Sequence, residues 1–341
     1  MGWSAALANG AAMAIRRKFS ASHFWEDTRK FNATAFNYIG ETTRYLMNQP
    51  AKPDDRNNPV EKIVGNGLRP DIWKPFKKRF GISKVYEFYG ATEMLLAFYN
   101  LLNLDNTMGF NLDPYAIVRY DLDTDEPVRS KNGFFEKVDR GEAGLLLGEI
   151  LDRTPFAGYT DEASSRKKIF RDVFAPGDMW LNTGDMVRDL GFRHAQFVDR
   201  LGDTFRWKGE NVSTAEVEEI VNSFPDISHS AVYGVVIQGT DGRAGMASLV
   251  PSVPVPQFDF QGFCDHLHRA LPSYAVPIFI RIKTEFDTTD THKIKKTDLK
   301  KEGFDLDQLS DPVYVLLPGS NEYTPLTREI HEGIIQGQYR F

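Results

Sequence analysis

Residues 181–221 read LNTGDMVRDLGFRHAQFVDRLGDTFRWKGENVSTAEVEEIV, and this stretch decides how the rest of the chain is interpreted. Its first half predicts a tight turn at 182–185 that carries an acid, then a second glycine turn at 190–192. A short strand with alternating apolar residues follows and ends at Val198. The first half therefore places a carboxylate in a loop beside a strand.

The second half of the stretch predicts the start of a new structural unit. A charged hairpin at 199–203 precedes a strand at 204–208 and a turn at 209–211. Ser213 then precedes Glu216 by three residues, a spacing at which a hydroxyl and a carboxylate satisfy each other's backbone amides at a helix start. Acids in loops, a basic hairpin and a glycine turn before a helix indicate a polar site between two units.

One string within this stretch, residues 203–214 (DTFRWKGENVST), resembles the domain junction of the adenylate-forming, AMP-binding enzymes. Within that superfamily it is similar to the fatty acid transport protein and very-long-chain acyl-CoA synthetase branch. The resemblance implies an α/β fold: the C-terminal part of a large layered adenylation domain with a β-rich subdomain, followed by a small α+β mobile domain. The expected boundaries are 1–200 for the first domain, with 111–180 as the subdomain, and 203–341 for the second, with a hinge near 201–203.

Composition agrees with a globular protein of two domains. The chain has 341 residues, 41% of them hydrophobic and 26% charged. A net charge of -6 argues against nucleic acid as a partner, because phosphate binding needs a clustered basic face. The single cysteine, Cys264, predicts a reducing compartment and a small buried side chain on a helix. No apolar run approaches the roughly 18 residues that span a bilayer, and the opening residues lack the basic leader of a signal peptide.

Alternating helical and strand patterns in residues 1–110 predict an α/β layer whose strand ends carry ligands. Two such ends stand out, 65–67 and 89–93. By resemblance, Gly65, Asn66 and Gly67 supply the backbone segment that lies along the adenine. Tyr89 and Gly90 supply an aromatic face and a turn, Thr92 a hydroxyl for phosphate, and Glu93 a carboxylate for Mg²⁺. Read without the resemblance, Glu93 suits a helix-start carboxylate equally well.

Three further residues are expected to bind nucleotide or catalyse its reaction. The resemblance implies that Asp185 accepts hydrogen bonds from the ribose hydroxyls and that Arg200 reaches the ribose and phosphate. The alternatives are an Asx-turn for Asp185 and a surface ion pair for Arg200. Lys293 occupies the position of the family's mobile catalytic lysine, although a lysine-rich stretch is also typical of a solvated helix face. Its neighbours Asp290 and His292 depart from the glycine and phenylalanine usual in the family.

Glycines 202 and 209 complete the expected site. Gly202 stands where the family pivots between its two arrangements, and glycine absorbs such backbone changes at low cost. Gly209 resembles the residue whose backbone admits the CoA arm. Trp207, beside it, is expected to pack in a core or interface.

Several secondary-structure predictions extend beyond the motifs. Residues 23–30 are expected to form a helix capped by Ser20 or Ser22, and residues 70–80 a helix with proline in its first turn. Residues 227–236 read as a strand pair interrupted at His229. Residues 277–283 predict an edge strand, and residues 293–301 begin what we expect to be the last helix.

The implied reaction is ATP-dependent activation of long- or very-long-chain fatty acids to acyl-CoA through an acyl-adenylate. Its ligands are fatty acid, ATP or AMP, Mg²⁺ and CoA. The family's Ser/Thr/Gly-rich triphosphate loop is not found in residues 1–110, so we expect weak activity and an uncovered sheet face open to a protein partner. The alternatives are a non-catalytic nucleotide- or acyl-binding protein, a partner of a longer synthetase, and a shortened product without a stable fold. The resemblance also suggests peripheral association with peroxisomal, endoplasmic reticulum or lipid-droplet membranes.

Overall fold

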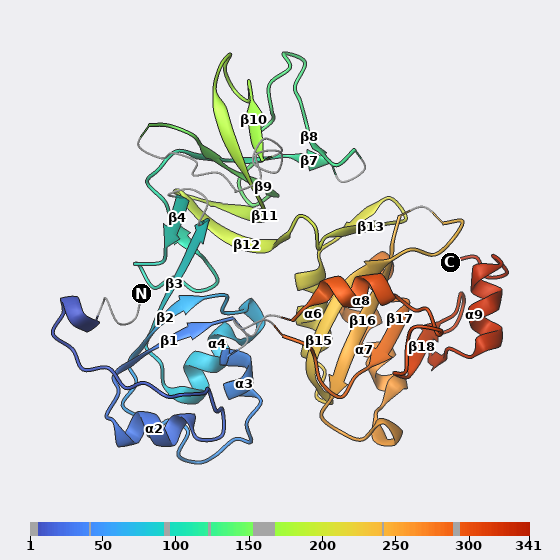
Figure 1. Cartoon of the computed structure of the whole chain (residues 1–341), viewed down its shortest axis with the longest axis horizontal. Coiled ribbons are helices and arrows are strands. Elements are labelled where there is room, and N and C mark those ends of the chain that lie inside the picture. Colours follow the sequence, from blue (N-terminus) through green and yellow to red (C-terminus); the bar gives the residue numbers. More distant parts are fainter. Residues whose placement is uncertain are drawn as a thin grey trace. The chain divides into compact units, whose positions relative to one another are not determined.

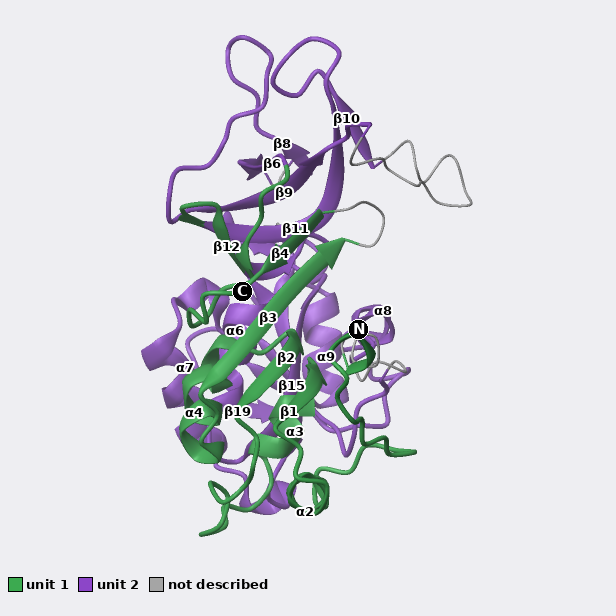
Figure 2. Ribbon diagram, turned by 90° about the vertical axis from the view of Figure 1, so that its left-hand side faces the viewer, with its two compact units in different colours: residues 1–113, 190–196, 290–293 green, residues 114–189, 197–289, 294–341 purple. Residues whose placement is uncertain are grey.

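The computed structural model describes residues 6–40, 42–91, 96–121, 124–152, 168–240, 242–288 and 294–341. The chain divides into two compact units, which Figure 2 shows in different colours. Unit 1 comprises residues 1–113, 190–196 and 290–293, and unit 2 comprises the remaining residues. The mixture of helices with large sheets confirms the predicted α/β class.

Unit 1 is a layer of helices packed on a sheet that begins with three parallel strands. Its helices are α2 (Phe24–Lys30), α3 (Thr42–Met47) and α4 (Pro70–Phe80), and its strands are β1 (Ala35–Ile39), β2 (Lys62–Asn66), β3 (Lys84–Ala91), β4 (Leu96–Tyr99) and β5 (Gly109–Phe110). Strands β1, β2 and β3 pair in parallel, and β4 and β5 continue the sheet antiparallel. Helix α4 connects two parallel strands, as β-α-β connections require.

Helix α4 forms for the reasons that its sequence predicts. Pro70 stands in the first turn, where its missing amide costs nothing, and Gly81 ends the helix in the left-handed conformation with φ of 71°. Its apolar face joins a core with the strands; the buried residues of that face are Ile72, Trp73, Phe76 and Phe80. Helix α2 also forms, but without the predicted serine cap: His23 is its N-cap, and the Ser20 and Ser22 hydroxyls bond each other at 3.2 Å.

The β-rich part of unit 2 contains the strands that carry the motif residues. These strands are β6 (Tyr115–Val118), β7 (Tyr120–Asp121), β8 (Glu126–Pro127), β9 (Ala143–Glu149), β10 (Ile169–Arg171), β11 (Met179–Gly191) and β12 (His194–Arg200). Strands β6, β9 and β11 lie side by side, and β10 pairs with the far end of β11. Strands β11 and β12 form a hairpin whose tip, 190–196, belongs to unit 1.

Of the two turns predicted in this hairpin, the first is wrong and the second is confirmed. The turn at 182–185 is wrong as a chain reversal: these residues lie inside β11, where the register with β9 shifts between Asn182 and Met186. A β-bulge of this kind re-aims side chains without ending the strand. The second turn is confirmed one residue later, at Phe192 and Arg193, which both have positive φ as a two-residue hairpin with primed geometry requires.

The C-terminal part of unit 2 is a five-stranded sheet with helices on it (Figure 1). Its strands run in the order β15 (Ile227–Val235), β16 (Ala244–Pro251), β17 (Phe279–Ile282), β18 (Val313–Leu316) and β19 (Tyr323–Pro325). The other elements are the hairpin β13 (Phe205–Trp207) and β14 (Glu210–Val212), helices α6 (Thr214–Asn222), α7 (Phe260–Ala270), α8 (Lys296–Glu302) and α9 (Arg328–Ile335), and the 3₁₀ turns η1 (Val255–Gln257) and η2 (Ser273–Ala275). Helices α6 and α8 both pack against β15.

Three predictions for this part are wrong. Strand β17 is not an edge strand, because it lies between β16 and β18. Its residues are buried on both faces, so its sequence lacks the polar alternation of a half-exposed strand. Helix α8 is followed by β18, β19 and α9, so it is not the last helix. The interruption at His229 is a register shift at the start of the single strand β15.

Two side-chain predictions are confirmed. Trp207 is 2% exposed and belongs to the core of the C-terminal part, and Cys264 is fully buried on α7. Within the described ranges, every helix is too short or too polar to cross a bilayer.

Candidate functional site

The predicted nucleotide residues of unit 1 lie at the carboxyl ends of two parallel strands. Gly65 and Asn66 end β2, Gly67 follows, and Tyr89 and Gly90 lie near the end of the neighbouring strand β3. The ring of Tyr89 is half-buried and makes an edge contact with Phe98 at 6.0 Å between centroids. The structure thus brings together the residues predicted to lie along the base, at the edge where α/β sheets bind ligands.

Two of these glycines are required by the backbone itself. A Cβ on Gly65 would overlap the carbonyl oxygen of Tyr38 in β1, so glycine permits the close approach of the two strands. Gly67 has φ of 83°, a left-handed conformation that other residues adopt at a cost. By contrast, a Cβ on Gly90 would meet open space.

Sequence reasoning missed Glu87, a buried acid at this same edge. It is 7% exposed, and its carboxylate accepts hydrogen bonds from the Tyr38 hydroxyl and from the Gly67 and Leu68 amides. Burial raises the pKa of Glu87 to about 8, against the lowering effect of these hydrogen bonds. The signal was present in the sequence: strand alternation places Glu87 on the same face as Val85, which is fully buried.

The predicted ribose residues lie together in unit 2. Asp185 is 3% exposed, and its Oδ1 lies 3.1 Å from Nε of Arg200, whose own side chain is 58% exposed. The buried carboxylate is therefore compensated by a cation at the surface, which is the arrangement that a buried charge requires. Asp185 comes from β11 and Arg200 from the end of β12.

The β-bulge of β11 fixes the position of Asp185. The Thr183 hydroxyl donates to the Leu146 carbonyl at 2.8 Å and accepts from the Asp185 amide at 3.1 Å. Gly184 has φ of 74°, and its carbonyl accepts from the Leu201 amide at 2.8 Å. Hydrogen bonds on both sides of the bulge thus preorganise the acid.

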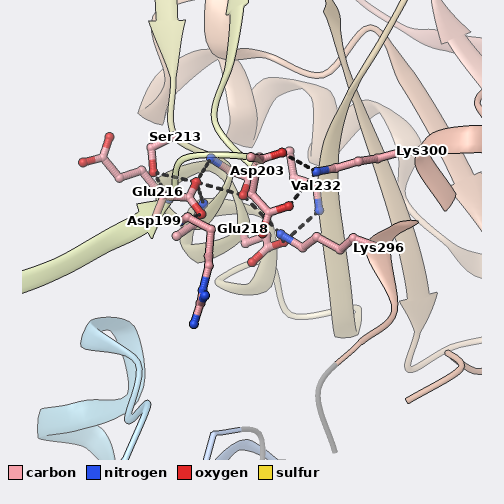
Figure 3. A network of polar contacts seen from close by, with 12 residues as sticks. Asp199, Asp203, Ser213, Glu216, Glu218, Val232, Lys296 and Lys300 are labelled. Carbon is pink, nitrogen blue, oxygen red and sulfur yellow. Dashed lines mark hydrogen bonds and ion pairs between the residues drawn. The ribbon is translucent and has the colours of Figure 1, made fainter. Parts of the chain in front are cut away.

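Next to Arg200, a polar network holds the start of α6 and the predicted hinge (Figure 3). The buried Asp199 carboxylate accepts from the Thr214 amide at 2.7 Å and from the Thr214 hydroxyl at 2.9 Å. One half of the predicted capping pair is confirmed, since the Ser213 hydroxyl accepts from the Glu216 amide at 3.3 Å, whereas the Glu216 carboxylate pairs with Arg188 at 3.2 Å. Burial raises the pKa of Asp199, while the nearby Lys296 lowers it.

Two lysines of α8 complete this network, and sequence reasoning assigned no role to either of them. Lys296 pairs with buried Glu218 at 2.6 Å, and Glu218 also accepts from the Val232 amide. Lys300 donates to the Gly202 carbonyl at 2.7 Å and to the Asp203 carboxylate at 2.6 Å. The predicted pivot is thereby tied to α8 in this arrangement (Figure 3).

The remaining predicted residues have local explanations or lie elsewhere. Gly209 has φ of 83° and follows Lys208, with φ of 52°, in the two-residue turn of the β13–β14 hairpin. The expected CoA contact of Gly209 stays a prediction. Thr92, Glu93 and Lys293 lie outside the described residues, so the phosphate, Mg²⁺ and catalytic roles predicted for them also stay predictions.

Known proteins match the chain over nearly all of its length. The model of the AMP-binding enzymes matches residues 1–147, and the model of the AMP-binding enzyme C-terminal domain matches residues 216–293. The chain belongs to the AMP-binding enzyme family. This agrees with the resemblance read from residues 203–214, which lie between the two matches.

Three similar proteins define the relationship further. The medium/long-chain-fatty-acid–CoA ligase FadD6 of Mycobacterium tuberculosis is 45% identical over 98% of this chain and 56% of its own length. Long-chain fatty acid transport protein 2 of Rattus norvegicus is 42% identical over 96% of this chain and 54% of its own. The solved structure of ATP-bound MatB from Rhodopseudomonas palustris aligns with a TM-score of 0.70 at 17% identity, covering 89% of this chain and 57% of MatB, which supports the fold. The chain thus spans about half the length of the curated relatives it matches.

Proposed function

We propose that this chain forms the adenosine-binding part of a fatty acyl-CoA ligase that makes acyl-CoA through an acyl-adenylate. The observation that carries the proposal is the buried Asp185 carboxylate, preorganised by a β-bulge and paired with Arg200. An ionised carboxylate is an acceptor with two oxygens, so it can receive hydrogen bonds from both vicinal hydroxyls of a ribose. Similarity to a fatty-acid–CoA ligase at 45% identity supports the substrate class.

The other ligands follow from the same proposal. ATP supplies the adenylyl group, and Arg200 provides a positive charge for its phosphates. Glu93 would hold Mg²⁺, Thr92 a phosphate oxygen and Lys293 the attacking carboxylate, while the backbone at Gly209 would admit CoA. Neither the φ of Gly202, which lies outside the left-handed region, nor the open space around its Cβ position requires glycine in this structure. A hinge would explain the residue instead, because glycine absorbs large backbone changes at low cost.

Binding of AMP and of 2′,3′-dideoxy-AMP, measured by isothermal titration calorimetry, tests the role of Asp185. We expect wild type to bind AMP at least 10-fold more tightly, and Asp185→Asn to lose most of that preference because the amide donates to one hydroxyl instead of accepting. The matched control, Glu329→Gln on the exposed surface of α9, should keep it. A folded Asp185→Asn protein with an undiminished preference would refute the assignment.

A second candidate function is nucleotide binding without turnover. The observation behind it is that the contacts described for Asp185 and Arg200 support binding of the nucleoside and carry no information on turnover. Such a protein would bind AMP without activating a fatty acid. Pyrophosphate release from ATP with a long-chain fatty acid separates the two: robust turnover supports the ligase, and AMP binding without turnover supports the second function.

A further inference from the structure

Glu87 is a buried acid in a strand whose neighbours are apolar. It lies in β3 between the buried Val85 and the half-buried Tyr89, and it is 7% exposed. Burying a carboxylate costs free energy that an apolar side chain of similar size would not, unless the carboxylate makes compensating contacts. An acid retained at such a position therefore calls for an explanation from its contacts.

The contacts of Glu87 join three neighbouring strands at one edge of unit 1. The hydroxyl of Tyr38, near the end of β1, donates to Oε2. The amide of Gly67, just beyond β2, donates to Oε1, and the amide of Leu68 lies 3.4 Å from Oε2. Register pairing places Gly65 opposite both Tyr38 and Glu87, so all of these groups lie at the same level of the sheet.

Both amides belong to the turn in which Gly67 has φ of 83°. Such a turn directs successive amides to one side, where one carboxylate can accept from both. Both amides donate to Glu87, and the Gly40 amide donates to the Asn66 carbonyl at 2.8 Å on the β1 side of the turn. The path of the backbone from Gly65 to Leu68 therefore depends in part on the carboxyl group of Glu87.

We propose that Glu87 is a positioning residue for nucleotide binding, which acts by holding the turn 65–68 in the shape that receives the adenine. The inference rests on the proposed function, which assigns the adenine segment to Gly65, Asn66 and Gly67. Tyr38 orients the Glu87 carboxylate from the other side. A burial that disfavours the ionised form, at the ligand-binding edge of a sheet, is typical of functional sites.

The test compares three substitutions at these positions in the full chain. Glu87→Leu removes every acceptor and should weaken AMP binding about 10-fold, which is about 1.4 kcal/mol. Glu87→Gln keeps one acceptor oxygen for Gly67 and an amide that can donate to the Tyr38 oxygen, so it should stay within about 3-fold of wild type. Tyr38→Phe removes the orienting hydroxyl and should weaken binding by an intermediate factor; it carries the test if Glu87→Leu does not fold.

A matched control separates positioning from general destabilisation. Asp55 is a buried acid of the same unit that pairs with Arg79, at the opposite end of α4 from the 65–68 turn. Asp55→Asn should lower the free energy of unfolding and leave the affinity for AMP within 2-fold of wild type. The ratio of affinities for AMP and IMP adds a readout of base recognition, which should fall in Glu87→Leu and stay constant in Asp55→Asn.

The outcomes distinguish the inference from the function on which it rests. Weaker AMP binding and a lower AMP to IMP ratio in Glu87→Leu, with recovery in Glu87→Gln, support the positioning role. Wild-type affinity and ratio in a folded Glu87→Leu or Tyr38→Phe protein overturn that role while leaving AMP binding intact. If wild type itself does not bind AMP, the proposed function fails, and the inference fails with it.

Discussion

Replacement of Glu87 by glutamine should change how the stability of unit 1 depends on pH. Burial raises the pKa of Glu87 to about 8 from an ordinary value of 4.5. Between these two values the folded protein keeps the proton that the unfolded chain has lost. The folded state therefore binds more protons, and its free energy of unfolding falls as pH rises from about 5 to about 8.

The size of the effect follows from the interval between the two pKa values. At about 1.4 kcal/mol for each pH unit, keeping this proton while the unfolded chain loses it lowers the free energy of unfolding by on the order of 4 to 5 kcal/mol between pH 4 and pH 8. Glutamine carries no proton to lose. The free energy of unfolding of Glu87→Gln should thus be close to that of wild type near pH 5 and exceed it progressively toward pH 8. The difference at pH 8 is a large share of the about 5–15 kcal/mol that is typical of a whole domain.

Guanidinium unfolding at pH 5, 6, 7 and 8 measures this difference. Following the transition by hydrogen exchange of peptides from residues 62–91 isolates unit 1, because a chain with two units need not unfold in one step. The difference between the two proteins' free energies of unfolding at each pH removes the contributions of the other titrating groups, which both proteins share. A difference that is constant from pH 5 to pH 8, or that favours wild type at pH 8, would refute the raised pKa.

Two further predictions concern the hinge and the glycines. Lys300→Met removes the contacts to Gly202 and Asp203. Hydrogen exchange at residues 201–204 should then accelerate roughly 5-fold, as expected for the loss of a partly exposed ion pair of about 1 kcal/mol. Lys301→Met, on the exposed side of α8, should leave this exchange unchanged. Equal exchange in both variants would show that Lys300 does not restrain the proposed hinge. Gly65→Ala should destabilise unit 1 by about 3 kcal/mol, because the added Cβ would overlap the Tyr38 carbonyl, whereas Gly90→Ala should be tolerated because its Cβ would meet open space. Denaturant midpoints compare the two variants. Equal midpoints would contradict the close approach of β1 and β2.

Local signals predicted the elements that have strong local causes. Helix α4 has proline at its start, glycine at its end and an apolar face, and its predicted bounds are those of the structure. Ser213 likewise caps α6 as its spacing with Glu216 indicates. Tertiary context decided the rest: the run in β17 reads as an edge strand by its length and flanking proline, but it pairs on both sides within the sheet.

The candidate site shows the same division. Family resemblance and turn chemistry pointed to Asp185 and Arg200, which the fold brings to 3.1 Å of each other although they lie on different strands. Strand alternation could have indicated that Glu87 is buried, but not which groups it contacts. Its partner Tyr38 is 49 residues away in sequence, and Gly202, the partner of Lys300, is 98 residues away. No local pattern reports a contact over such a separation.

Hydrogen exchange with and without AMP shows whether the nucleotide contacts both proposed segments, because one experiment reports on each of them. We expect saturating AMP to slow exchange at residues 65–68, the proposed adenine segment, and at residues 183–186, the proposed ribose segment, with little change in α9. Binding of AMP that protects neither segment, or protection confined to other parts of the chain, would contradict it.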